Sequence, residues 1–180
     1  LVNLISRPYK LYTALLTQSG VDNEQEIDGD TGPMVKGVTY YINVNTDNFD
    51  LTPYGAPNNN AGTYFVANQD VATLPFTATL QLFYNTGAPI VTVLENTIGN
   101  VWFGYSSVGD YRVYSDGLFT DLKTFQIVGS LPDCCASDLF GRIIFNSSND
   151  SACSLFSYDS LNVLINDQLV NTPIEIRVYN

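Results

Sequence analysis

Residues 38–44 read Val-Thr-Tyr-Tyr-Ile-Asn-Val, and apolar and polar side chains alternate along this stretch. In an extended chain every second side chain points to the same face. The even-numbered positions therefore form an apolar face of Val, Tyr, Ile and Val, and the odd-numbered positions form a face of Thr, Tyr and Asn. This pattern predicts a β-strand with one buried face.

Short runs of the same kind recur through the whole chain, each bounded by Gly, Pro, Asn, Asp or Ser. They are Tyr9–Thr17, Thr63–Ala67, Phe76–Tyr84, Ile90–Leu94, Val101–Tyr105, Tyr111–Tyr114, Thr124–Val128, Arg142–Phe145, Leu155–Tyr158, Leu161–Ile165 and Ile174–Tyr179. No long helical stripe is present, and only a single helical turn is expected, at Cys134–Leu139. The sequence predicts an all-β, antiparallel β-sandwich, jelly-roll-like or fibre-domain-like.

Composition excludes several classes of function. The chain has no histidine, which excludes Ser-His-Asp, Cys-His and His-zinc chemistry. Its net charge of −11 opposes the phosphate backbone, so we expect no nucleic-acid partner. No apolar run approaches the roughly 18 residues of a spanning helix, so we expect no membrane partner.

Five acidic side chains alternate along residues 21–33, namely Asp22, Glu24, Glu26, Asp28 and Asp30. Clustered carboxylates are the ligands that calcium prefers, so these residues are the metal-site candidates. However, Ile27 occupies the position after the third acid, where an EF-hand loop needs glycine for its tight turn. We therefore favour a solvated acidic loop, with no metal and no cofactor.

The three cysteines leave two alternatives open. Cys153 could pair with Cys134 or Cys135, closing a loop of about 20 residues and stabilising the fold by roughly 3 kcal/mol. Alternatively, all three cysteines are reduced and partly buried thiols. Their spacing matches no usual zinc pattern.

Catalytic motifs are not evident. Asp110, Asp116 and Asp121 lie near aromatic residues, as the acids of a sugar-cleaving enzyme often do, but Asp is also common at turns for backbone reasons. Trp102 could stack on a sugar, although a single Trp in a strand is usually part of the core. The sequence therefore favours a protein that is not an enzyme.

Several stretches resemble bacteriophage virion proteins, both tail-fibre-like and capsid-associated. They are Tyr9-Lys-Leu-Tyr-Thr-Ala-Leu-Leu-Thr-Gln-Ser-Gly20, Ala88-Pro-Ile-Val-Thr-Val-Leu-Glu-Asn-Thr-Ile-Gly99, Val108-Gly-Asp-Tyr-Arg112, Gly117-Leu-Phe-Thr-Asp-Leu-Lys-Thr-Phe125 and Thr172-Pro-Ile-Glu-Ile-Arg-Val-Tyr-Asn180. In the proteins that these stretches resemble, the first runs almost directly into the second. Here residues 21–87 separate them, and residues 37–42 and 48–67 resemble another phage module. The resemblance thus implies a host β-sandwich of residues 1–20 and 88–180, with a β-rich insert at 21–87.

The resemblance implies a viral structural protein located in the virion, as a fibre, spike, decoration or minor capsid component. Its expected partners are other virion proteins, further copies of itself and a host-surface receptor. The alternative is a receptor- or carbohydrate-binding module of a phage fibre or a bacterial surface protein, for which Tyr54, Tyr64 and Tyr105 are candidate platform residues. A carboxylate-based glycosidase is the third hypothesis.

Overall fold

The structure is a computed structural model and describes residues 7–28, 32–72, 80–129 and 142–180. Within these ranges the chain forms twelve strands in three four-stranded antiparallel sheets, with one short 3-10 helix, η1 (Thr52–Tyr54). The predicted all-β class is confirmed, and the arrangement is sandwich-like. The helical turn expected at Cys134–Leu139 lies outside the described residues. In the described part of the chain, no helix has the length and apolar character needed to cross a membrane.

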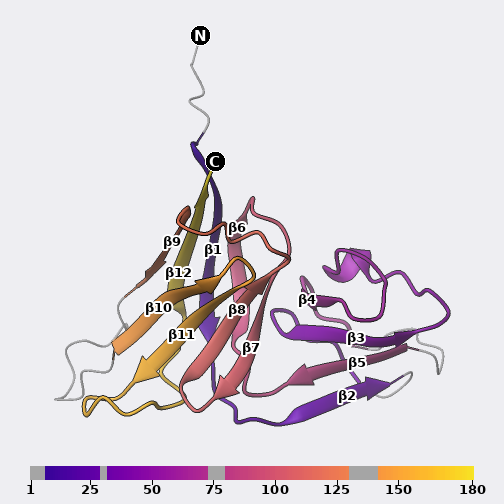
Figure 1. The fold of residues 1–180 in the computed structure, drawn as a ribbon. Helices are drawn as coiled ribbons and strands as arrows, with labels where there is room; N and C mark the ends of the chain where they lie inside the picture. The colour runs from indigo at the N-terminus through magenta and orange to yellow at the C-terminus, as the bar shows by residue number, and fades with distance from the viewer. Residues whose placement is uncertain (1–6, 29–31, 73–79, 130–141) are drawn as a thin grey trace.

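The first sheet has the strand order β6–β1–β12–β9 and draws its strands from both ends of the chain (Figure 1). These strands are β1 (Tyr9–Thr17), β6 (Ile90–Asn96), β9 (Thr124–Val128) and β12 (Thr172–Tyr179). β12 pairs with β1 on one side and with β9 on the other, so the alternating C-terminal segment is central in its own sheet. Its residues Ile174, Ile176 and Val178 are buried, whereas Glu175 and Arg177 face outward.

The second sheet packs against the first and has the order β10–β11–β8–β7. Its strands are β7 (Val101–Ser107), β8 (Asp110–Ser115), β10 (Arg142–Asn149) and β11 (Ala152–Tyr158). One apolar cluster joins the two sheets, and its largest fully buried members include Tyr12, Phe103, Tyr111 and Phe119. Two antiparallel sheets sharing a core of inward-facing side chains make a β-sandwich.

The third sheet, with the order β2–β5–β3–β4, lies beside the sandwich (Figure 1). Its strands are β2 (Glu24–Asp28), β3 (Thr39–Asn45), β4 (Tyr64–Val66) and β5 (Leu80–Asn85). It has a core of its own, which includes Met34, Tyr40, Ile42, Phe65 and Leu82. All four strands fall between residues 21 and 87, and the division of the chain into a host and an insert stays a prediction.

One strand prediction is wrong. Residues 161–165 form no strand, and only an isolated bridge joins Leu164 to Tyr158. The Asp159 carboxylate accepts hydrogen bonds from the N–H groups of Leu161 and Val163, at 2.8 and 2.9 Å, and Asn162 has a φ of 62°. A side chain that bonds to the backbone just ahead of it favours a turn over a strand, as seen here.

The acidic stretch 21–33 is not wholly a loop, because residues 24–28 form β2 and pair with β5. The physical reason is Ile27, which is 4% exposed and belongs to the third sheet's core. Glu24 and Glu26, one residue to either side of Gln25, remain exposed. The otherwise polar strand is thus held at the sheet edge by its pairing with β5 and by one buried apolar side chain.

Candidate functional site

Hydrogen bonds fasten the third sheet to the sandwich. The buried N–H of Phe103 on β7 donates to Thr39 Oγ1 on β3 at 3.1 Å, and Asn100 Nδ2 donates to the Tyr64 carbonyl oxygen at 2.9 Å. On the other side of the junction, the Val91 N–H donates to the Gly37 carbonyl oxygen at 2.9 Å. Breaking the Phe103–Thr39 bond would leave a buried donor unsatisfied. The three contacts together hold the third sheet against β7 and β6.

A row of stacked aromatic rings crosses this junction. Trp102 on β7 is the cross-strand partner of Tyr114 on β8, and Tyr41 on β3 is the partner of Tyr64 on β4. Strand register therefore places each pair together, as is favourable for aromatic neighbours. The junction then brings Tyr64 to Trp102, with ring centroids 5.7 Å apart and an interplanar angle of 7°. We call Tyr41, Tyr64, Trp102 and Tyr114 the aromatic row.

Within the row, the outer pairs are also close. The Trp102 and Tyr114 rings are stacked with centroids 5.8 Å apart, and those of Tyr41 and Tyr64 are tilted with centroids 4.6 Å apart. Ring pairs at such distances contribute about 0.5–1.5 kcal/mol beyond their buried area. The row is thus both a joint between two sheets and a continuous aromatic surface.

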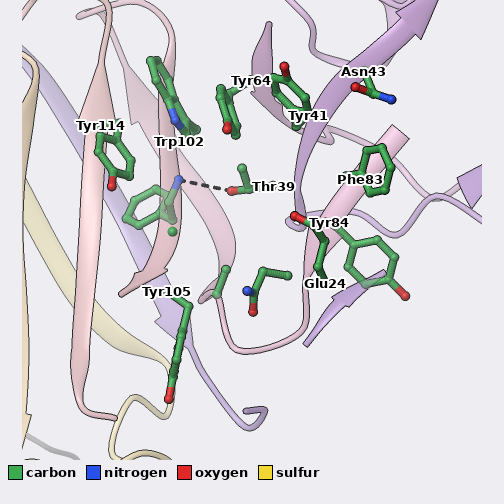
Figure 2. Close-up of a pocket in the computed structure, with 14 residues that line it drawn as sticks. Glu24, Thr39, Tyr41, Asn43, Tyr64, Phe83, Tyr84, Trp102, Tyr105 and Tyr114 are labelled. Atoms are coloured by element: carbon green, nitrogen blue, oxygen red, sulfur yellow. Dashed lines mark hydrogen bonds between the residues drawn. The ribbon is translucent and has the colours of Figure 1, made fainter. Parts of the chain in front are cut away.

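A groove of about 740 Å³ runs along the row between the third sheet and the sandwich. In Figure 2 one wall carries Trp102, Tyr105 and Tyr114, and the opposite wall carries side chains of the third sheet. Its polar lining comes from Glu24, Thr39, Asn43 and Asn85. This volume falls within the range of small-ligand sites, which are typically lined by aromatic side chains with a few polar groups. We call it the aromatic groove.

Two local features of the groove are the absence of a side chain at position 104 and the protonated hydroxyl of Tyr64. Position 104 on β7 is glycine, and a Cβ built there would lie 3.1 Å from Cε2 of Tyr114, so a larger side chain would intrude on the groove. Burial raises the pKa of the Tyr64 phenol above its ordinary value, and Tyr41, Tyr114 and Glu24 raise it further by charge repulsion. The Tyr64 hydroxyl therefore stays protonated at neutral pH and can both donate and accept a hydrogen bond.

Comparison with protein-family models, curated proteins and solved structures finds no match to this chain.

The aromatic residues singled out from the sequence divide between two places. Tyr64 and Tyr105 line the groove, whereas Tyr54 belongs to η1 and stacks on Phe49 with ring centroids 6.2 Å apart. Trp102 is half-buried and lines the groove, so its interpretation as a core side chain is wrong. The reason is its place on the outward face of β7, two residues from Gly104, while its neighbour Phe103 points into the sandwich core.

The structure does not gather the calcium candidates into a site. Among the described residues, no group of three or more Asp, Glu, His or Cys side chains could hold a metal ion. Asp22 accepts a hydrogen bond from Asn85 Nδ2 at 2.7 Å, and Glu24 belongs to the aromatic groove. Asp28 ends β2, and Asp30 lies outside the described residues.

The remaining candidate groups lie apart from the groove. Asp110 forms an ion pair with Arg112 at 3.2 Å, and Asp116 and Asp121 lie in turns, so none of these three acids lines it. Cys153 is a free, buried thiol whose pKa is raised to about 11 by burial. Cys134 and Cys135, its candidate disulfide partners, lie outside the described residues.

Proposed function

We propose that this chain is a non-enzymatic structural component of a bacteriophage virion that acts through protein–protein assembly. The observation that carries the proposal is where the phage-like segments lie in the fold. Residues 9–20 contain β1, residues 88–99 contain β6, residues 117–125 lead into β9, and residues 172–180 contain β12. Segments far apart in the sequence thus meet as the four neighbouring strands of the first sheet. The fifth such segment, residues 108–112, contributes to β8 of the second sheet. The resemblance therefore follows the β-sandwich, as expected if that unit has a common role.

The outer face of this sheet combines exposed apolar and aromatic side chains with charged ones, as protein–protein interfaces do. Phe125 and Ile127 on β9 are 52% and 39% exposed, and the register places them beside Arg177 and Glu175, which form an ion pair. Tyr179, which is 39% exposed, packs against Tyr9 in the same sheet, with ring centroids 5.3 Å apart and the rings tilted. Aromatic and Arg side chains are enriched in protein interfaces. This outer face supports contact with a neighbouring virion subunit.

Substituting this face should prevent incorporation without unfolding the chain. We expect the double variant Phe125→Glu/Ile127→Glu to be incorporated at least tenfold less than the parent chain, because two added carboxylates would have to be desolvated in the interface. The measurement is the copy number per particle, obtained by quantitative mass spectrometry of gradient-purified particles from a host that supplies each variant.

The matched control is Leu122→Glu, because Leu122 is 98% exposed in the turn before β9 and outside the paired strands. It should be incorporated like the parent chain. Equal incorporation of the double variant and the parent, with both chains folded, would contradict an assembly role for this face.

A further inference from the structure

The aromatic groove is not used by the assembly face, which belongs to the other sheet of the sandwich. It also exposes more aromatic surface than a joint between sheets requires. Tyr64 remains 41% exposed although it lies between Tyr41 and Trp102 in the row. Exposed aromatic surface beside polar groups is typical of an interaction or ligand-binding site.

The phenol hydroxyls and the carboxylate of the groove are available for a ligand, whereas Thr39, Asn43 and Asn85 already form hydrogen bonds within the chain. Among the described residues, none provides a hydrogen-bond partner for the hydroxyl groups of Tyr41, Tyr64 and Tyr114 or for the Glu24 carboxylate. Each phenol hydroxyl can donate and accept, and the carboxylate accepts. A ligand that satisfies these groups must carry several hydroxyl or amide groups along an otherwise apolar surface. Sugar rings have this combination, since C–H groups form one face and hydroxyls project from the rim.

Charge narrows the class of ligand further. Glu24 contributes a carboxylate to the lining of the groove, and the chain carries a net charge of −11. An acidic saccharide would meet repulsion from both, whereas neutral and N-acetylated sugars would not. The groove has a volume of about 740 Å³ and is lined from two sheets, which suits several linked sugar units rather than a single one.

We propose that the aromatic groove binds an oligosaccharide of neutral or N-acetylated sugars, such as a segment of a cell-surface glycan. Sugar units pack along Trp102 and Tyr64 and hydrogen-bond to the phenol hydroxyls and to Glu24. The site requires both the sandwich and the third sheet, because each supplies one wall. This inference does not depend on the chain being a virion component.

The single tryptophan of the chain makes the test specific, because Trp102 lies in the groove and reports on it alone. The purified full chain is titrated with β-glucan oligomers, N-acetylglucosamine oligomers, polyuronate oligomers and a proline-rich peptide. Tryptophan fluorescence follows binding, and calorimetry confirms it. We expect saturable changes with at least one neutral or N-acetylated oligomer, and at least tenfold weaker binding of the polyuronate.

Two groove variants and one matched control complete the experiment. Tyr64→Ala removes the ring beside Trp102, and Gly104→Val adds a side chain that presses on Tyr114 and narrows the groove. Each should weaken binding at least tenfold. Tyr179→Ala removes a tyrosine of nearly equal exposure that also contacts a neighbouring ring, that of Tyr9. Tyr179 lies outside the groove, so binding should stay within twofold. The proposal is overturned if no oligosaccharide binds, if only the peptide or the polyuronate binds, or if both folded groove variants bind like the parent chain.

Discussion

Replacing Phe103 with alanine should lower the free energy of unfolding by about 3–5 kcal/mol, the range for removing a fully buried aromatic ring. Phe103 is 1% exposed and lies between the two sheets, with its ring centroid 6.2 Å from that of Tyr12. Its loss leaves a cavity that β8 and β1 cannot move in to fill, because each of these strands is hydrogen-bonded to a partner strand on both sides. A domain of ordinary stability has about 5–15 kcal/mol in total, so this change should remove a large part of it.

The measurement is urea unfolding followed by circular dichroism, with Phe125→Ala as the control. Phe125 is the same residue type on a strand of the sandwich, but it is 52% exposed, so its truncation should cost less than half as much. Equal losses for the two variants would contradict the described core.

Replacing Gly37 with alanine should destabilise the chain by about 3 kcal/mol or more and loosen the third sheet from the sandwich. Gly37 has a φ of 83°, which side-chain-bearing residues rarely adopt, and an added Cβ would lie 2.5 Å from the Val91 carbonyl oxygen. Val91 is also the residue whose N–H donates to the Gly37 carbonyl across the junction. The backbone has to move, and the movement separates the third sheet from β6.

Two measurements test the expected effects of Gly37→Ala on stability and on the junction. Urea unfolding gives the loss of stability, and a red shift of Trp102 emission reports the opening of the junction. The control is Gly62→Ala, because Gly62 has a φ of 91° but nothing within 4 Å of an added Cβ. The Gly62→Ala variant should lose about 1–2 kcal/mol of its free energy of unfolding, which is the cost of placing a side chain at a positive φ. Its Trp102 emission should stay unchanged. Equal losses of stability and equal Trp102 emission in the two variants would mean that the close approach of Gly37 to the Val91 carbonyl oxygen does not constrain the junction.

The sequence predicted most of the strands because alternation is a local property. Residues 124–128 were predicted as a strand and form β9 with the same limits, and β12 contains the predicted Ile174–Tyr179 run. β2 was missed because a single side chain, Ile27, carries its burial, and one residue makes no alternating pattern. Residues 161–165 were overpredicted because composition does not reveal that Asp159 turns the backbone.

The groove was only partly predictable, for a different reason. The sequence predicts Tyr64 and Tyr105 as exposed aromatic candidates and offers Trp102 as either a sugar-stacking or a core residue, but it does not single out Tyr41 or Tyr114 for a platform. The row depends on cross-strand register within two sheets and on the docking of one sheet against the other. Neither is encoded in the spacing of residues along the chain. A search for aromatic residues on the outward faces of paired strands could have found Trp102 with Tyr114, but not their meeting with Tyr64.

The most direct test of a virion role is a cryo-electron microscopy reconstruction of the purified particle. The account predicts density for the three-sheet fold at symmetry-related positions, with the outer face of β6–β1–β12–β9 against a neighbouring subunit and the aromatic groove accessible from outside the particle. Particles without this chain, or copies in which that outer face contacts only solvent, would contradict it.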